Sequence, residues 1–248
     1  MYAYKCITAY EGTRYNGWQR QGNTNNTIQG KIEEILSKQL EEPIEICGSG
    51  RTDAGVHALG QVFHFHCGQE LDTKHFLTAV NGHLPKDIRV LAMEPCDERF
   101  HARLHASGKI YQYRIDTSPY GNLFYRNTSH HIAAQLDLEA MKAAATLLTG
   151  THDFKSFCSN KRMKKSSVRT IYDITFTTDH DSQMLFLTFS GNGFLYNMVR
   201  ILTGTLIEIG LGIRKVEEIP TILGGCDRGL AGHTAPAKGL FLIKVTYE

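Results

Sequence analysis

The sequence has little of several features that mark other classes of protein. Its 248 residues include one tryptophan, six prolines and six cysteines. The cysteines are scattered without paired spacing, which favours reduced, buried thiols over a disulfide framework. No uncharged apolar run approaches the roughly 20 residues of a membrane helix, and the first six residues contain no apolar signal core. We therefore expect a cytoplasmic protein that does not enter a membrane.

Net charge is also small, but its distribution is uneven. The whole chain carries +2 at pH 7. Residues 1–100 hold 10 basic and 13 acidic side chains, a net −3, whereas residues 101–248 hold 17 and 12, a net +5. The second half is therefore the place to expect a polyanionic partner. Hydrophobic residues make up 42% of the chain, which supports a sizeable core and excludes a disordered or fibrous protein.

Hydrophobic periodicity predicts the order strand, helix, strand, strand, helix, strand in the first half. Apolar residues from Ile28 to Leu40 recur at helical spacing, with Thr27 as the N-cap. Alternation or β-branched runs predict the strands. The expected strands are 2–9, 44–47, 61–66 and 88–93, and the expected helices are 28–40 and 72–80.

The second half repeats this order with one extra helix. Strands are expected at 109–116, 168–178, 184–190 and 240–247, and helices at 137–148, 194–209 and 214–223. We therefore predict an α+β protein of two tandem ferredoxin-like (βαββαβ) units with antiparallel sheets, at 1–104 and 105–248. Two long stretches, 10–26 and 150–167, show no regular pattern and are expected to be loops.

A glycine-rich turn at 48–57 carries Arg51 and Asp53 two residues apart. Asp53 fits a nucleophile, a base or a metal ligand, but an Asx-turn residue is the more ordinary interpretation. A phosphate-binding loop is less well supported, because the segment lacks a Gly-Lys-Ser/Thr ending and leads into a strand.

Two further groups of residues could carry function. His57, His64, His66 and Cys67 suggest zinc, but their spacing matches no metal motif, so we expect no metal. Residues 99–114 contain six basic or histidine side chains and no acid, and alternation places Lys109, Tyr111 and Tyr113 on one strand face. Such a face suits RNA as well as it suits an ordinary aromatic core.

Several motifs resemble those of the tRNA pseudouridine synthase A family. The most specific is Gly-Arg-Thr-Asp-Ala-Gly-Val-His-Ala at 50–58. The other motifs lie at 10–21, 81–85, 100–103, 109–113, 153–157 and 193–200. The resemblance extends from about residue 3 to the C-terminus. It implies isomerisation of uridine to pseudouridine at positions 38, 39 and 40 of the tRNA anticodon stem-loop, without cofactor or metal.

The resemblance also implies roles for individual residues. Asp53 matches the catalytic aspartate, Tyr111 the active-site tyrosine and Arg200 the motif arginine. Arg51 matches the arginine linked to base flipping. RNA contacts fall on Phe100, His101, Ala102, Arg103 and Leu104, and on Lys161, Arg162, Met163, Lys164 and Lys165. We expect a homodimer bridged by one tRNA, and two units joined around a central basic cleft that binds RNA.

The chemistry suits these residue types. The reaction breaks the C1′–N1 bond and joins C1′ to C5 without net oxidation, so it needs no redox cofactor. Burial would neutralise a carboxylate, whereas a nearby cation such as Arg200 favours its ionised form. From the residues alone, Arg200 could instead extend to solvent. The alternatives are a non-catalytic RNA-binding module and a zinc-dependent hydrolase or deaminase.

Overall fold

The structure is a computed structural model that describes residues 1–160, 163 and 165–247. The chain forms two compact units, one of residues 1–107 and 241–248 and the other of residues 108–240. The expected boundary at 104/105 therefore lies three residues early, and the last strand belongs to the first unit rather than the second. The reason is a long-range pairing, because Phe241 and Leu242 pair in parallel with His57 and Ala58. The basic cleft expected to join the units stays a prediction.

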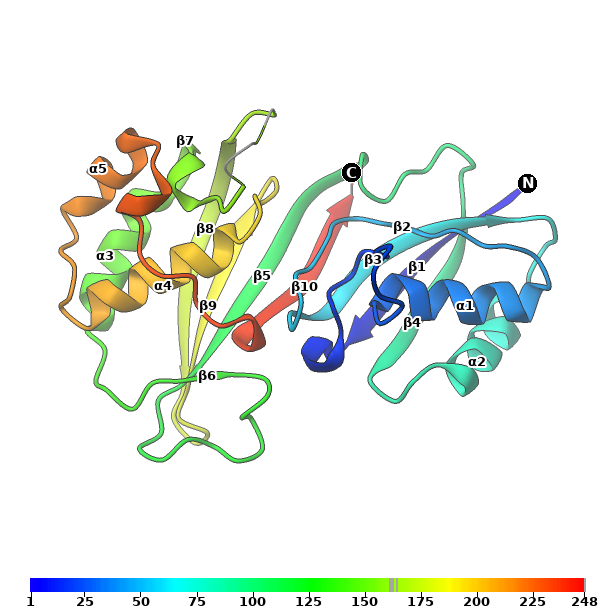
Figure 1. The fold of residues 1–248 in the computed structure, drawn as a ribbon, viewed down its shortest axis with the longest axis horizontal. Helices are drawn as coiled ribbons and strands as arrows, with labels where there is room; N and C mark the ends of the chain where they lie inside the picture. The colour runs from blue at the N-terminus through cyan, green and yellow to red at the C-terminus, as the bar shows by residue number, and fades with distance from the viewer. Residues whose placement is uncertain (161–162, 164, 248) are drawn as a thin grey trace. The chain divides into compact units, whose positions relative to one another are not determined.

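The first unit is a sheet with two helices on one face (Figure 1). Its strands β4, β1 and β3 are neighbours in that order and run antiparallel, while β2 and the last strand β10 also pair with β3. The elements are β1 (Tyr2–Tyr10), α1 (Ile28–Leu40), β2 (Cys47–Gly48), β3 (His57–Cys67), α2 (Thr73–His83), β4 (Ile88–Cys96) and β10 (Leu240–Tyr247).

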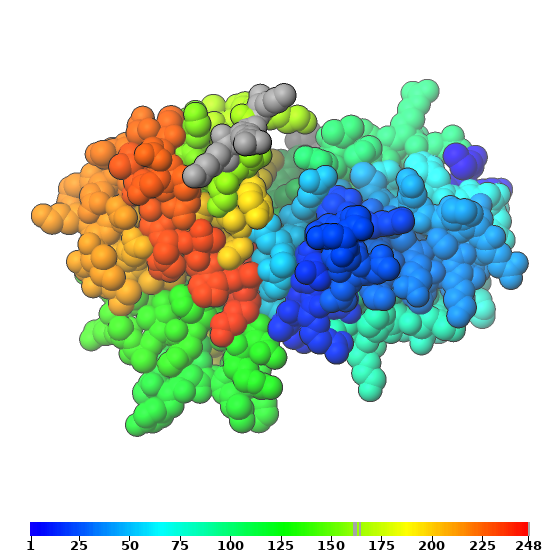
Figure 2. All heavy atoms as spheres, in the orientation of Figure 1, coloured from blue at the N-terminus to red at the C-terminus, as the bar shows by residue number. Residues whose placement is uncertain are grey.

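Helix α1 follows its sequence pattern closely. Thr27 caps it by accepting a hydrogen bond from the Gly30 N–H at 3.2 Å. Ile28, Ile32, Leu36 and Leu40 are buried, which places the apolar stripe against the sheet. The preceding segment, 10–26, is seen at the surface of this unit in blue (Figure 2) and contains a short 3₁₀ turn at Gly12–Arg14.

The second unit has the strand order β5, β9, β8, β7, with β6 pairing in parallel with β5. Helices α3 and α4 pack against each other (Figure 1). The elements are β5 (Ala106–Asp116), β6 (His130–His131), α3 (Leu138–Leu148), β7 (Gly150–Asp153), β8 (Val168–Asp179), β9 (Met184–Gly191), α4 (Met198–Gly210) and α5 (Glu218–Gly225). These elements confirm the predicted α+β class.

The second unit corrects three expectations. The helix expected at 214–223 lies at Glu218–Gly225. The helix expected from 194 begins at Met198, because Asn197 has the left-handed φ of 61°, which a helix interior does not accommodate. The loop expected at 150–167 contains strand β7, whose residues Gly150–Asp153 pair antiparallel with β8. Across the residues that the structure describes, no helix is long and apolar enough to cross a membrane.

Candidate active site

The turn that carries Asp53 is fixed to β3 by one buried glutamine. Gln61 donates from Nε2 to the Gly50 carbonyl at 2.9 Å, and its Oε1 accepts from the Ser49 hydroxyl at 2.7 Å. The Ser49 N–H donates to the Val62 carbonyl at 2.7 Å. The start of the turn is therefore hydrogen-bonded to strand β3, although the bonded residues lie 11 or more positions apart in the sequence.

The segment 10–18 supports the other side of the turn. The Trp18 N–H donates to the Thr52 carbonyl at 3.0 Å, and the hydroxyls of Tyr10 and Thr52 are hydrogen-bonded at 2.8 Å. The Val56 N–H donates to the Asp53 carbonyl at 3.1 Å, which closes the turn. Asp53 itself is half-buried. The turn is thus a rigid platform for a carboxylate.

Two glycines allow these segments to approach each other. A Cβ at Gly12 would overlap the Val56 carbonyl, and a Cβ at Gly48 would lie 2.5 Å from Nε1 of Trp18. Neither neighbouring group can move away, because the Val56 atom is a main-chain carbonyl and the Trp18 ring is fully buried. Both motifs quoted from the sequence, 10–21 and 50–58, therefore form one structural unit around Asp53.

Tyr111 lies on β5 in the second unit, and its side chain is only 8% exposed. Its ring meets the ring of Phe194 edge to face, with centroids 5.3 Å apart. Phe194 comes from the 193–200 motif just before α4. The structure therefore brings two of the motifs quoted from the sequence together at this tyrosine.

Arg200 lies on the first turn of α4, and its guanidinium is held from two directions. Nε donates to the Ala235 carbonyl at 2.8 Å, and Nη1 donates to Oδ1 of Asn197 at 2.9 Å. Asn197 in turn donates from Nδ2 to the Ser159 hydroxyl at 3.0 Å. A half-buried arginine with these contacts is not the solvent-extended side chain that the sequence left open.

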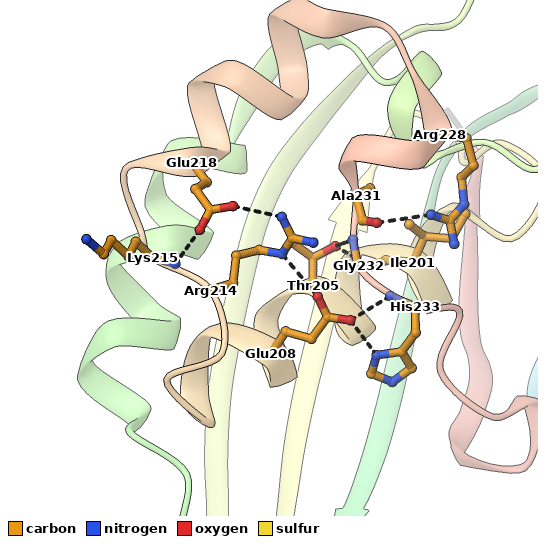
Figure 3. Close-up of polar contacts among 10 residues, drawn as sticks. All are labelled: Ile201, Thr205, Glu208, Arg214, Lys215, Glu218, Arg228, Ala231, Gly232 and His233. Atoms are coloured by element: carbon orange, nitrogen blue, oxygen red, sulfur yellow. Dashed lines mark hydrogen bonds and ion pairs between the residues drawn. The ribbon is translucent and has the colours of Figure 1, made fainter.

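The segment that receives Arg200 is itself fastened to α4 (Figure 3). One oxygen of Glu208 accepts from the main-chain N–H and from ring Nδ1 of His233, at 2.8 and 2.9 Å, and the other accepts from Nε of Arg214 at 3.0 Å. The Thr205 hydroxyl accepts from the Gly232 N–H at 3.0 Å. Burial raises the pKa of Glu208, but the bonds from His233 and Arg214 outweigh it and lower the pKa below its ordinary value.

The residues expected to contact RNA at 100–104 form a tight turn in the first unit. Ring Nδ1 of His101 accepts from the N–H groups of Arg103 and Leu104, each at 3.2 Å. Ala102 is buried and donates its N–H to Nδ1 of His64 at 3.2 Å. The side chains of Arg103 and Leu104 are exposed. His101 and Ala102 thus shape the turn, and Arg103 and Leu104 face solvent.

The second segment expected to bind RNA is described only in part. Lys161, Arg162 and Lys164 lie outside the described residues. Met163 is half-buried and Lys165 is exposed. Arg51 of the first unit is exposed, and its Nε donates to Oε1 of Gln19 at 3.1 Å.

The histidines that suggested a metal have structural partners. His57 accepts from the Gly12 N–H at 3.1 Å and stacks on Phe241, with ring centroids 4.5 Å apart. Burial, with the neighbouring His101, His66 and His105, lowers the pKa of His64 to about 4. Among residues 1–160, 163 and 165–247, no three His, Cys, Asp or Glu side chains are grouped as metal ligands.

Sequence reasoning missed Gln61, Asn197 and Glu208. In the sequence, Gln61 looks like an ordinary polar residue of a strand. Its hydrogen-bond acceptor Gly50 lies 11 residues away, and its donor Ser49 lies 12 residues away. Asn197 carried a usable signal, because asparagine tolerates the left-handed conformation that ends or begins a helix. Glu208 sits in an apolar stretch, where a lone acid signals a buried partner.

Comparison with known proteins agrees with these features. Residues 6–104 and 144–248 match the family model of tRNA pseudouridine synthase. A Brevibacillus brevis protein named tRNA pseudouridine synthase A is 44% identical over 243 residues, which cover 98% of each chain. Proteins of the same name from Bacillus sp. KSM-64 and Geobacillus kaustophilus are each 45% identical over 245 residues, covering 98% of this chain and 99% and 94% of theirs.

The chain therefore belongs to the tRNA pseudouridine synthase family. It is an isomerase that converts uridine to pseudouridine, and the resemblance found in its sequence motifs is confirmed.

Proposed function

We propose that the enzyme modifies uridines 38, 39 and 40 of the tRNA anticodon stem-loop, with Asp53 as its nucleophile. The observation that carries the proposal is the 48–57 turn. It holds a single carboxylate, it is bonded to β3 and to the 10–18 segment, and it lies within the matched family region. Such a platform keeps a carboxylate in place while a nucleotide is bound.

The reaction is balanced without a cofactor. The C1′–N1 bond breaks, the base turns, and C1′ joins C5; C5 then loses its proton and N1 gains one. Asp53 attacks a carbon of the ribose or base, or assists formation of a glycal. Tyr111 stacks on the target base and offers its hydroxyl for proton transfer. From the family resemblance we assign to Arg200 the role of favouring the ionised form of Asp53.

A target base inside a stem has to leave its stack before it can react. We assign to Arg51 the space that the flipped base leaves, which agrees with its exposure on the Asp53 turn. The 100–104 turn contacts the tRNA through Phe100 and the exposed Arg103 and Leu104, and the basic segment 161–165 contacts its phosphates. His101 and Ala102 support that contact through the shape of the turn.

Three further proposals concern the whole protein. The strand and helix order of the first unit supports a ferredoxin-like arrangement there, and we propose a second ferredoxin-like unit in tandem with it. By family resemblance the enzyme acts as a homodimer bridged by one tRNA, which light scattering with and without tRNA tests. It works in the cytoplasm, where its substrate is made.

Mass-spectrometric mapping of pseudouridine in tRNA treated with purified protein tests the proposal. We expect product at positions 38–40 with the wild type and none with Asp53→Asn, which keeps shape but removes the nucleophilic charge. The control Asp173→Asn alters an exposed carboxylate on β8 and should behave as wild type. A wild type that forms pseudouridine only outside positions 38–40 would contradict the proposed target. Turnover by Asp53→Asn at the wild-type rate would remove Asp53 from the mechanism.

A further inference from the structure

A chain of side-chain amides in the first unit leads from a buried carboxylate to Arg51. Glu33 on α1 is 6% exposed, and its Oε1 accepts from Nε2 of Gln29 at 2.8 Å. Oε1 of Gln29 accepts from Nε2 of Gln19 at 2.8 Å. Oε1 of Gln19 accepts from Nε of Arg51 at 3.1 Å. Four side chains thus form one continuous series of hydrogen bonds.

The direction of every bond in this series is fixed by its two ends. An ionised carboxylate only accepts and a guanidinium only donates. Gln29 therefore turns its NH₂ group to Glu33 and also to the Ile46 carbonyl at 3.1 Å. Its oxygen is left for Gln19 and for the Arg20 N–H at 3.0 Å. Gln19 then has to present its own oxygen to Arg51.

The same network is anchored to the main chain near the Asp53 turn. The Ile46 N–H donates to Oε1 of Glu33 at 3.1 Å, so both main-chain groups of Ile46 are bound by side chains of α1. Oε2 of Glu33 lies 3.6 Å from Nη1 of Arg20. Because α1 is rigid and its inner face is buried, Gln29 and Glu33 offer a fixed reference for the position of Gln19.

We propose that Gln19, oriented by Gln29 and Glu33, is a positioning residue that holds the Arg51 guanidinium ready for the flipped-out state of the tRNA. The inference rests on the role proposed above for Arg51. An exposed arginine loses considerable rotamer freedom when it is fixed, and a bond at Nε restricts the plane of the guanidinium before RNA arrives. The Arg51 side chain then loses part of its conformational entropy already in the free enzyme, and less is lost when the base flips.

Gln19→Leu tests the proposal with little risk to the fold. It removes the acceptor for Arg51. Oε1 of Gln29 loses the Gln19 donor but still accepts from the Arg20 N–H. The control Gln39→Leu changes a half-buried glutamine of α1 that lies outside the series. The first measurement is the ¹⁵N order parameter of the Arg51 Nε–H in the free protein. We expect it to fall in Gln19→Leu and to stay at the wild-type value in Gln39→Leu.

The second measurement is the single-turnover rate of Gln19→Leu, Arg51→Leu and the double variant. Loss of a hydrogen bond to a charged group should slow Gln19→Leu by about tenfold. The double variant should be no slower than Arg51→Leu, because Gln19 acts through Arg51.

The outcomes separate the two hypotheses. An unchanged Arg51 order parameter in Gln19→Leu overturns the positioning role, whatever Arg51 does in catalysis. Rate effects that multiply in the double variant overturn it as well, since Gln19 would then act by another route. A wild-type rate for Arg51→Leu instead overturns the proposed base-flipping role of Arg51, and the order parameter alone then decides the positioning of its side chain.

Discussion

Two tyrosines on β5 lie two residues apart on the same strand face but have different partners. Tyr111 meets the ring of Phe194 edge to face, and Tyr113 is fully buried with its hydroxyl donating to the Pro236 carbonyl at 2.8 Å. Burial raises the pKa of the Tyr113 hydroxyl, although Arg200 opposes the shift. The structure thus assigns a packing role to Tyr113. The strand pattern alone does not distinguish this role from that of Tyr111.

Replacing each tyrosine by phenylalanine should separate these roles. Tyr111→Phe keeps the ring and removes the hydroxyl proposed for proton transfer, so single-turnover rates should fall by roughly 10²- to 10⁴-fold with tRNA affinity retained. Tyr113→Phe, the matched control, should lose about 1 kcal/mol of unfolding free energy with one hydrogen bond and keep its rate within a few-fold. An unchanged single-turnover rate in Tyr111→Phe would exclude its hydroxyl from the chemistry.

At this scale the sequence predicts candidates better than contacts. The pattern around Asp53 favours an Asx turn over a nucleophile, and only the family resemblance favours the nucleophile. The partners that fix the turn, such as Gln61 and Trp18, come from other segments of the chain. Local pattern carries no information on such pairings, because they arise only when the sheet and the 10–18 segment fold together.

Among the larger elements, those with a strong period are predicted well. Helix α1 has the bounds that its apolar stripe and Thr27 predict, and β8 and β9 end within one residue of expectation. Elements that depend on long-range pairing are predicted less well. Strand β3 begins at His57 rather than at 61, because its first residues, His57 and Ala58, pair with β10. The polar strand β7 exists because β8 is beside it.

Glu208 shows how one side chain can hold two elements together. It joins α4 to the segment before Ala235, whose carbonyl receives Arg200. Its pKa lies below the ordinary value in the folded protein. A carboxylate of this kind stabilises the fold above the pKa of its unfolded form, and that contribution is lost as the pH falls through the lower folded value. The affected window therefore lies below pH 4.5, the ordinary value.

Glu208→Gln should accordingly destabilise the protein in a pH-dependent way. At pH 7 we expect a loss of about 1–2 kcal/mol in unfolding free energy, after allowing for solvent screening. The difference from wild type should shrink as the pH is lowered below 4.5. Denaturant unfolding across this range measures it. Glu139→Gln, at an exposed helical pair with Lys142, should change stability by less than about 0.5 kcal/mol. A constant difference down to acid pH would contradict the role of the ionised form.

For the whole molecule, the uneven charge is the property that relates most directly to a polyanionic substrate. The part of the chain after residue 100 carries the net +5, and the stretch between Asp153 and Asp173 contains no acid. Chain connectivity is less predictable at this scale. The C-terminal strand returns to the first unit, and no local pattern distinguishes that strand from one that stays with its sequence neighbours.

Salt dependence of tRNA binding distinguishes a phosphate-binding segment from a merely solvated one. Each phosphate contact contributes a slope of roughly −0.9 in log K against log salt for duplex DNA, and an RNA stem should be similar within a factor of two. Alanine at Lys161, Arg162, Lys164 and Lys165 should therefore weaken binding and flatten the slope by about two to four. Single-turnover chemistry on bound tRNA should change less, because Asp53 and Tyr111 are intact.

The control replaces four exposed lysines elsewhere and removes the same charge. They are Lys38, Lys74, Lys86 and Lys142. Filter binding across a salt series measures both slopes. Equal slopes for the two variants would mean that segment 161–165 acts only through net charge.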